Sequence, residues 1–225
     1  LAKGFYTDAE YFLNKALERD PNNKELLLKK LSVYKKIDDK NKYNKTLEHL
    51  YAFYPEDEDI EYTYQLQQFE KGKDYLQQGQ LYEAKSVFLL LRTKPEWEVL
   101  ANEQLYNIAM QQQKYDEALT YTNYLIDNYP DNAEYKLQKS DLFFKTQQYK
   151  DAISISRNLN ETYPESEKYK DIYQNQLSLY ISVLMKNEEY REASETLDQL
   201  LAQNPTKQLY LYSINAALAI QHKEK

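Results

Sequence analysis

Few side chains in this sequence have the type and spacing that catalysis or metal binding requires. Cysteine is absent, which excludes disulfides, thiolate metal ligands and cysteine nucleophiles. The two histidines, His49 and His222, have no second histidine at helical spacing, so neither a metal site nor a catalytic dyad is expected. Three glycines are too few for phosphate-binding loops of the GxGxxG or GxxxxGK type. We therefore predict no enzymatic activity, no cofactor and no metal.

The acidic run EDEDIE, residues 56–61, is the remaining candidate for cation binding. It lacks the alternating oxygen ligands and the turn glycine of a calcium loop. Its carboxylates are better suited to the N-terminus of a following helix, where the helix macrodipole favours negative charge. We interpret the run as a solvent-exposed turn before a helix.

Charge and hydropathy exclude further classes of function. The net charge of -7 argues against nucleic acid as a partner, because phosphate binding needs a dominant positive surface. No apolar run approaches the roughly 18 to 20 residues needed to cross a bilayer, so a soluble protein without direct membrane insertion is expected. The chain starts with Leu1 and not with Met, so the lack of a signal peptide does not define the compartment. Its richness in Tyr, Asn, Lys and Gln is associated with low-GC bacterial genomes, and both the cytoplasm and export to the periplasm stay open.

Six prolines divide the chain at nearly regular intervals of 34, 40, 35, 34 and 41 positions: Pro21, Pro55, Pro95, Pro130, Pro164 and Pro205. An alanine lies 12 positions before four of these prolines and 11 positions before Pro95: Ala9, Ala118, Ala152 and Ala193, and Ala84. A small residue at this position lets two helices pack closely, and the proline ends the helix. A second amphipathic helix precedes each alanine-containing helix, so each unit is predicted to be an antiparallel helix pair.

This spacing resembles the tetratricopeptide repeat, a 34-residue helix–turn–helix unit with characteristic small, aromatic, alanine and proline positions. The resemblance covers essentially the whole chain and implies an all-α, right-handed superhelical solenoid of about twelve helices in a single domain. We expect a partial repeat, five complete repeats and a terminal helix, at residues 1–23, 24–57, 58–97, 98–132, 133–166, 167–207 and 208–225.

Some units depart from the family pattern. The early tryptophan of the family is missing. The unit ending at Pro55 has Thr46 in the alanine position, and a shortened second helix is expected there. In the unit ending at Pro130 the small and aromatic positions are exchanged, as Tyr106 and Ala109. These departures concern individual packing contacts rather than the fold.

Two units are longer than the others, and they recur at nearly the same separation, 109 positions from Pro55 to Pro164 and 110 positions from Pro95 to Pro205. Both are expected to carry their additional residues before or in the first helix of the pair. A duplicated block of three repeats with protruding helices would explain this, and insertion where packing tolerates it is the alternative.

The first residues, LAKGFYTDAEYF, align with the tail of a first helix, a turn at Gly4 and a second helix. We therefore expect that the chain begins within a repeat and belongs to a longer protein. A natural short cap is the alternative, although a cap would be expected to cover its inner face.

The resemblance implies a row of apolar side chains on the concave face of successive first helices. Such a row would bind an amphipathic helix or an extended peptide, and burial of the same residues as core is the alternative. The residues are Leu66, Phe69, Leu76, Leu100, Met110, Leu137, Phe144 and Met185.

A lysine cluster within residues 24–45 forms a local basic patch in this acidic chain. The resemblance places Lys29, Lys35 and Lys36 on the concave side, where an acidic peptide could bind through charge-assisted contacts. An ordinary solvent-exposed helix face is the alternative. Some members of the family bind a C-terminal carboxylate with a lysine and asparagine clamp, but no adjacent pair of positions here assembles one.

The terminal stretch QLYLYSINAALAIQH is apolar nearly all round. Leu211, Ile214 and Leu218 form one stripe that is expected to pack on the repeat ending at Pro205. The remaining faces require cover from a further repeat or from a second copy of the chain, and we expect self-association through Leu209, Tyr210, Tyr212 and Ala216. The alternative is that the small alanines leave too little exposed area to matter.

These patterns predict a non-catalytic scaffold that binds a peptide or protein segment on its concave face. Two alternatives stay open. One is a structural or accessory subunit of a bacterial envelope or secretion assembly. The other is a regulatory array of a longer protein whose active domain lies outside this sequence.

Overall fold

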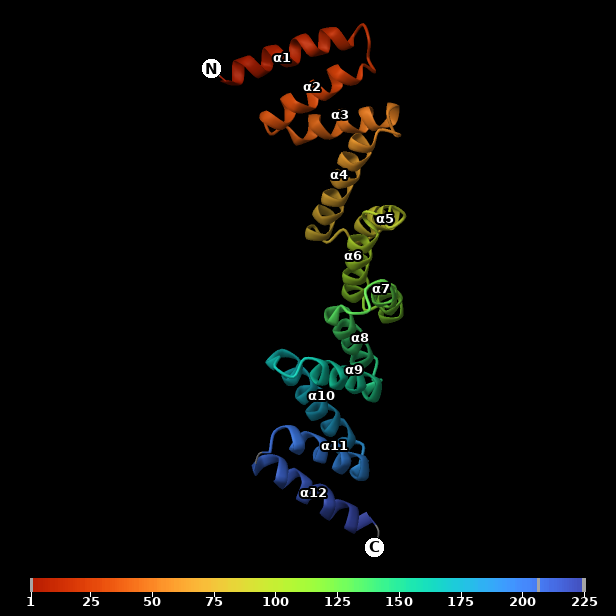
Figure 1. Ribbon diagram of the computed structural model, residues 1–225, viewed down its shortest axis with the longest axis vertical. Helices are drawn as coiled ribbons and strands as arrows, with labels where there is room; N and C mark the ends of the chain where they lie inside the picture. The colour runs from red at the N-terminus through yellow and green to blue at the C-terminus, as the bar shows by residue number, and fades with distance from the viewer. Residues whose placement is uncertain (1, 206, 224–225) are drawn as a thin grey trace. The chain divides into compact units, whose positions relative to one another are not determined.

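The computed structural model describes residues 2–205 and 207–223, with side chains described for residues 5–205 and 209–221. Within these residues there are twelve α-helices and no β-strand, which confirms the predicted all-α fold (Figure 1). His222 lies outside the described side chains. The helices are α1 (Ala2–Leu17), α2 (Lys24–Lys36), α3 (Lys40–Phe53), α4 (Glu58–Gln77), α5 (Leu81–Leu91), α6 (Glu98–Gln111), α7 (Tyr115–Asn128), α8 (Ala133–Lys145), α9 (Tyr149–Thr162), α10 (Glu167–Lys186), α11 (Tyr190–Gln203) and α12 (Lys207–Lys223).

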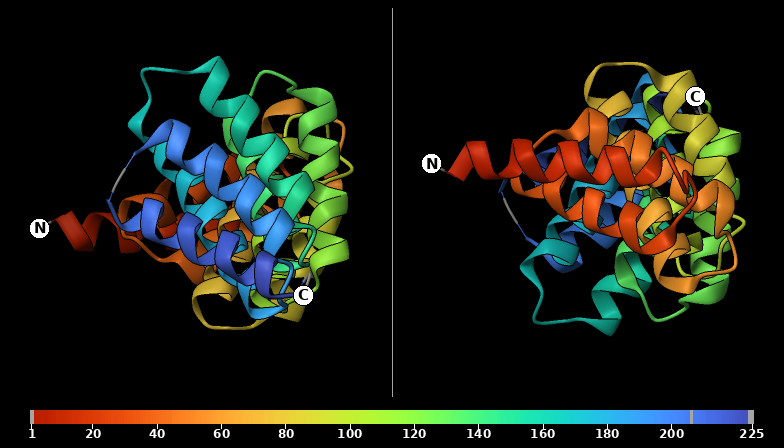
Figure 2. Two further views of the ribbon diagram at one scale, coloured as in Figure 1. Left: turned by 90° about the horizontal axis from the view of Figure 1, so that it is seen from below. Right: turned by 90° about the horizontal axis from the view of Figure 1, so that it is seen from above.

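The chain divides into two compact units, Leu1–Ala101 and Asn102–Lys225, with the boundary inside α6. In the first unit α2 packs on α3 and α4 packs on α5, while in the second α8 packs on α9 and α10 packs on α11. At the far ends of the helix order, α1 packs on α2 and α12 packs on α11 (Figure 2). Helices that are neighbours in the sequence are therefore neighbours in space within each unit. The right-handed winding and the single domain stay predictions.

The additional residues of the two long repeats lie in the first helix of each repeat. α4 and α10 have 20 residues each, whereas α2 and α8 have 13 and α6 has 14. Glu58 and Glu167, which begin the two long helices, are 109 positions apart. The expectation of a shortened second helix before Pro55 was wrong, because α3 has the same 14 residues as α7 and α9. The short second helix is α5, with 11 residues, which passes into turns at Arg92.

The alanines of the repeat pattern lie where the helices pack most closely. Ala84, Ala118, Ala152 and Ala193 are all 0% exposed, which confirms the predicted burial of Ala118 and Ala152. Thr46 takes the alanine position in α3, and it is buried because its hydroxyl donates to the carbonyl of Lys42 at 2.8 Å. The small residue at each of these positions allows two helix backbones to approach, and threonine is tolerated once its hydroxyl is satisfied.

Each turn inside a helix pair contains one residue in the left-handed backbone region. This residue lies two positions before the second helix in every complete pair: Asp38, Gly79, Gln113, Gln147 and Glu188, with φ between 55° and 73°. Only Gly79 is a glycine, the residue that adopts this region without a steric cost. The other four carry a side chain in a conformation that L-residues disfavour.

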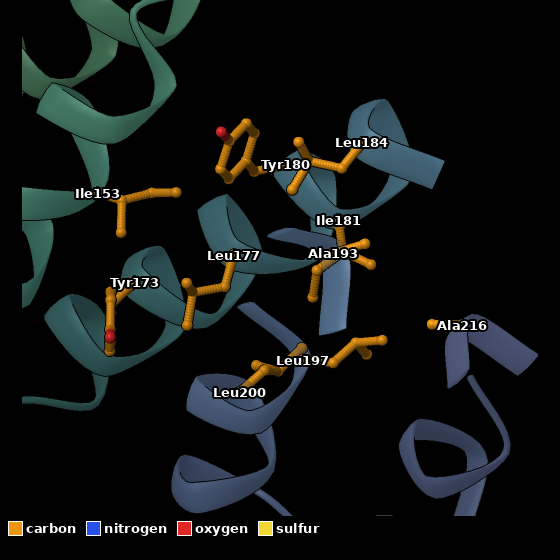
Figure 3. Packing of buried hydrophobic residues seen from close by; sticks show 10 residues of the cluster. All are labelled: Ile153, Tyr173, Leu177, Tyr180, Ile181, Leu184, Ala193, Leu197, Leu200 and Ala216. Atoms are coloured by element: carbon orange, nitrogen blue, oxygen red, sulfur yellow. The ribbon is translucent and has the colours of Figure 1, made fainter. Parts of the chain in front are cut away.

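Each unit has its own core. In the first unit, leucines of α2 and α3 pack with Ile60 of α4. In the second unit, α10 contributes half of a larger cluster, and residues of α9, α11 and α12 complete it, among them Ala193 and Ala216 (Figure 3). Repeat arrays are stabilised in this way by contacts between adjacent helices rather than by one central core.

The acidic run before α4 acts at a helix terminus, as the sequence predicted. The Asp57 carboxylate accepts a hydrogen bond from the backbone N–H of Ile60 at 3.1 Å and so caps the helix. Asp57 also pairs with Lys24 at the start of α2. Glu58, Asp59 and Glu61 occupy the first turn of α4, where negative charge is favourable.

Candidate binding site

Ion pairs and hydrogen bonds connect the first helices of each unit with neighbouring segments. The Lys24–Asp57 pair connects α2 with α4, and Glu61 of α4 accepts from Lys94 at 2.7 Å. In the second unit the Tyr135 hydroxyl donates to Glu103 at 2.7 Å, and Lys168 pairs with Glu134. These contacts hold neighbouring segments of each unit together.

The first unit contains a groove between α2, α3 and α4. It consists of two hollows with volumes of about 270 and 530 Å³ that have Lys35 and Tyr43 in common. Leucines and Ile60 line the smaller hollow, together with Ser32, Asp59 and Thr63. Mostly polar and charged side chains line the larger hollow, among them Asp38, Glu48 and Glu70. The groove thus offers an apolar part and a charged part that meet at Lys35.

Of the three predicted lysines, only Lys35 lines this groove. Its side chain is exposed and forms no hydrogen bond or ion pair with the described residues. Lys29 is held by Glu25 one turn earlier at 2.6 Å. Lys36 is exposed but lies outside both sets of lining residues. A free ammonium group beside an apolar floor suits a ligand carboxylate next to an apolar side chain.

Tyr43 and Tyr34 supply neutral polar groups to the same groove. Burial raises the pKa of the Tyr43 phenol. Burial and the hydrogen bond from its hydroxyl to Glu10, at 2.9 Å, raise the pKa of Tyr34. Both hydroxyls therefore stay protonated at neutral pH and are suited to hydrogen bonding rather than to proton transfer.

Apart from Ile60, the face of α4 that lines the groove is polar. Its lining side chains recur at helical spacing along the helix: Asp59, Thr63, Gln67, Glu70, Lys71 and Asp74. Sequence reasoning missed these residues because it followed the apolar row. The signal that could have found them is their own helical spacing, which places them on one helix face.

Phe69 was wrongly expected on a concave surface. It is 8% exposed, and its ring contacts Phe88 and Trp97 at centroid distances of 5.5 and 5.2 Å. The physical reason is Gly72, one turn further along α4, where a Cβ atom would lie only 2.7 Å from the ring of Phe88. The missing side chain lets Phe88 of α5 pack against α4, so this side of α4 belongs to the core.

The other members of the apolar row differ in exposure and contacts. Leu66 and Leu100 are 41% and 42% exposed. Phe144 contacts the ring of Tyr149 on α9 at 5.0 Å, and Met185 packs against the core of the second unit. The remaining three are half-buried: Leu76, Met110 and Leu137.

The terminal helix α12 packs through a different stripe from the one expected. Ala216 is 0% exposed and Leu209 packs against the same cluster, so these two residues were wrongly expected on a free surface. Leu211, Ile214 and Leu218, which were expected to pack on the preceding repeat, are 52%, 55% and 57% exposed. Tyr210 and Tyr212 are exposed, as expected.

The second unit has a polar hollow of about 300 Å³ along α9, α10 and α11. Arg157, Lys150 and Glu192 in this hollow already have hydrogen-bond or ion-pair partners. The Arg157 guanidinium donates to the Tyr173 hydroxyl at 3.1 Å and to Gln199 at 2.6 Å, and Lys150 pairs with Glu192 at 2.8 Å. A ligand here would have to displace these contacts, so the hollow is a weaker binding candidate than the groove of the first unit.

The described residues contain no cluster of three or more His, Asp or Glu side chains that could hold a metal ion. His49 bonds through Nε2 to Asn22 at 2.9 Å and stacks on Phe53. Among the described helices, none is long and apolar enough to cross a membrane.

A family model described as tetratricopeptide repeat matches residues 105–156, which include α7 and α8. This segment of the chain therefore contains tetratricopeptide repeat sequence. The matched segment is built from helix pairs in the same way as the repeats on either side of it. Ala118 and Ala152 are buried where its helices cross. No curated protein matches the sequence significantly.

Solved structures of repeat proteins resemble the chain at low sequence identity. A tetratricopeptide repeat protein from Parabacteroides merdae is 18% identical, with 96% of this chain and 79% of that chain covered and a TM-score of 0.38. YrrB, described as having an unusual peptide-binding site, is 15% identical, with 90% and 97% covered and a TM-score of 0.47. PilW, a type IV pilus biogenesis factor, is 16% identical, with 92% and 90% covered and a TM-score of 0.44. Similarity at this level carries no information about partners.

Proposed function

We propose that this repeat protein is a non-catalytic scaffold that binds a peptide segment in the groove between α2, α3 and α4. The observation that carries the proposal is the position of Lys35, unpaired and shared by the apolar and the charged hollow. Tetratricopeptide repeats generally serve as protein-interaction scaffolds, and a groove between first helices is a place where an extended segment can bind without unfolding either partner.

The lining residues indicate the chemistry of the segment. The smaller hollow, at about 270 Å³, has room for one large apolar side chain above Leu31, Leu47 and Leu50. A carboxylate next to that side chain would reach Lys35. The segment we expect is therefore a short peptide with an apolar anchor followed or preceded by an acidic residue.

The test is selection of binding peptides from a random display library, followed by titration of the enriched peptides. We expect enrichment of peptides with an apolar residue beside an acidic one. Lys35→Glu should weaken their binding at least about tenfold, since a hydrogen bond to a charged group contributes about 1.5 to 3 kcal/mol. Lys36→Glu is the matched control, because it changes the same charge on the same helix outside the groove.

Equal loss of binding in both lysine variants would mean that only overall charge matters. Enrichment of peptides without an acidic residue would contradict the role of Lys35. Either result would remove the proposed site.

A further inference from the structure

α5 exposes a stripe of apolar side chains in the middle of the chain. Tyr82, Leu89 and Leu90 are 80%, 41% and 73% exposed. Together with Ser86, which is also exposed, they recur at helical spacing and share one face of the helix. The other side of α5 packs on α4 (Figure 1). We call these four residues the α5 stripe.

Other second helices carry polar side chains at the positions of the α5 stripe. These positions lie two before and two, five and six after the alanine of the repeat pattern, which is Ala84 in α5. α9 and α11 have polar or charged residues at all four: Lys150, Ser154, Arg157 and Asn158, and Arg191, Glu195, Asp198 and Gln199. α3 and α7 have Asn44 and Asp116 at the first position, and Ala52 and Tyr124 at the last. Among the second helices, α5 alone has a large aromatic or aliphatic side chain at both ends of the stripe.

The exposure of the α5 stripe follows from its position in the repeat. α9 has helices of its own unit on both sides, because it packs on α8 and on α10. Its four equivalent residues are nevertheless all exposed. Neighbouring first helices therefore leave this side of a second helix in water, and α5 presents an apolar surface where α9 presents a polar one.

The small hydroxyl groups beside these apolar side chains are already satisfied within their own segment. The Ser86 hydroxyl donates to the carbonyl of Tyr82 at 3.0 Å. The Thr93 hydroxyl, just after the helix, donates to the carbonyl of Leu90 at 2.7 Å. Glu83 lies about 100° around the helix from Tyr82, at the edge of the stripe, where its carboxylate stays in water. Covering the stripe therefore leaves no buried hydroxyl or charge without a partner.

We propose that two copies of this chain pack together through their α5 stripes, about a twofold axis that passes near Ser86. Ser86 lies halfway between Tyr82 and Leu90 in the sequence. Two antiparallel α5 helices therefore place Tyr82 of each copy against Leu89 and Leu90 of the other. The small Ser86 side chains meet at the centre and let the two helices approach closely. Because both copies use the same surface, the contact ends at a dimer.

The area of the contact suits a second copy of the chain. Aromatic side chains bury about 150 to 250 Å² each, so the six apolar side chains of two stripes and the residues at their edges remove on the order of 1,000 Å² from water. This area is near the lower limit for a specific interface, and one stripe supplies only half of it. The dimer is therefore expected to dissociate on dilution.

The first test is the mass of the 225-residue protein in sedimentation and light-scattering experiments over a range of concentrations. The mass is expected to rise from the 27.0 kDa of one chain towards twice that value and no further. Leu90→Asp should keep the protein monomeric without changing its helical circular dichroism, because this side chain is 73% exposed. Leu179→Asp is the matched control, since Leu179 is 55% exposed on α10, outside the stripe.

The second test uses the absence of cysteine from the chain. Ser86→Cys should form a disulfide-linked dimer under mild oxidation, because the two Ser86 positions face each other across the axis. Ser154→Cys is the matched control, since Ser154 is exposed at the equivalent position of α9 and should stay unlinked.

Salt separates an apolar contact from an ionic one. Each copy has a net charge of -7, so salt should strengthen the dimer by screening the repulsion between copies. A dimer that salt dissociates would overturn the proposal. So would a wild-type protein that stays monomeric at the highest concentration, a dimer that survives Leu90→Asp, or equal cross-linking of the two cysteine variants.

Discussion

At the scale of single residues, the turns inside the helix pairs carry the clearest local strain. Gln147 has a φ of 63°, in the region where a Cβ atom meets the backbone, and it lies two positions before α9. Asp38, Gln113 and Glu188 repeat this arrangement, while Gly79 avoids it. Packing of the helix pair imposes this turn geometry. At four of the five turns the left-handed position holds a residue other than glycine, the residue that adopts this conformation most easily.

Gln147→Gly should therefore stabilise the protein by about 0.5 to 1 kcal/mol, because glycine removes the steric cost of the left-handed conformation. Urea unfolding would measure the change. Ser154→Gly, at an exposed position inside α9, is the control and should cost about 0.5 kcal/mol through lower helix propensity. A loss of stability in both variants would mean that the turn is not strained.

At the scale of elements, the packing of α8 on α9 depends on two small residues. Ala152 is 0% exposed, and its carbonyl accepts a hydrogen bond from the Ser140 hydroxyl at 2.9 Å. The amide of Gln176 on α10 donates to the same hydroxyl at 2.9 Å. Three helices therefore meet at one place, where a larger side chain has no room.

Ala152→Leu should overpack this crossing and reduce the free energy of unfolding by about 1 to 3 kcal/mol. Ser154→Leu, two positions further along α9 and exposed, should change it by less than about 0.5 kcal/mol. Thermal and urea unfolding would check both. Equal effects of the two changes would show that the crossing is looser than the structure indicates.

One carboxylate links α1 to both of the helices that follow it. Glu10 accepts hydrogen bonds from Lys42 on α3 and Tyr34 on α2, both at 2.9 Å. The hydrogen bond with Lys42 is the main cause that lowers the pKa of Glu10 below its ordinary value of 4.5. A lowered folded-state pKa means that this stabilisation is complete above the ordinary pKa and is lost as pH falls through the folded value.

Glu10→Gln should therefore lower the melting temperature at pH 6 to 7, and the difference from the wild type should disappear at a pH well below 4.5. Asp8→Asn, on the exposed side of α1, is the control and should leave the melting temperature nearly unchanged. A difference between Glu10→Gln and the wild type that stays constant with pH would mean that the carboxylate charge has no role.

At the scale of the whole molecule, stability should vary along the helix order because each helix is held only by its neighbours. The described side chains of α1, residues 5–17, include none that is fully buried. α10, in contrast, buries six side chains, among them Leu177 and Leu184. Local opening needs little free energy where few apolar contacts are lost.

Amide hydrogen exchange at low protein concentration should therefore be at least about a hundredfold faster in α1 than in α10. Mass spectrometry of peptides from the two helices would measure it. Uniform protection along the chain would contradict a stack of neighbour-stabilised helices and indicate one cooperative unit.

The sequence by itself determined most of the helix pairs and where they end. The expected turn at Gly4 was wrong, because α1 continues without a break from Ala2 to Leu17. Proline cannot continue a helix, and a small residue such as Ala118 or Ala152 marks a close crossing, so both are local requirements that single residues reveal. The two long first helices followed from the spacing of Pro55 and Pro164 in the same way. These features depend on backbone geometry and steric size, which act within a few residues of one another.

Tertiary structure alone decided which neighbour each face meets. Phe69 has the apolar character of a groove residue, but Gly72 lets Phe88 of α5 cover it. The apolar stripe of α12 predicted that Leu211 and Ile214 pack on the preceding repeat, but the residue buried there is Ala216. The physical reason is that burial of apolar area has no direction. An apolar pattern predicts that a helix face is buried. Only the position of the adjacent helices decides which element buries that face.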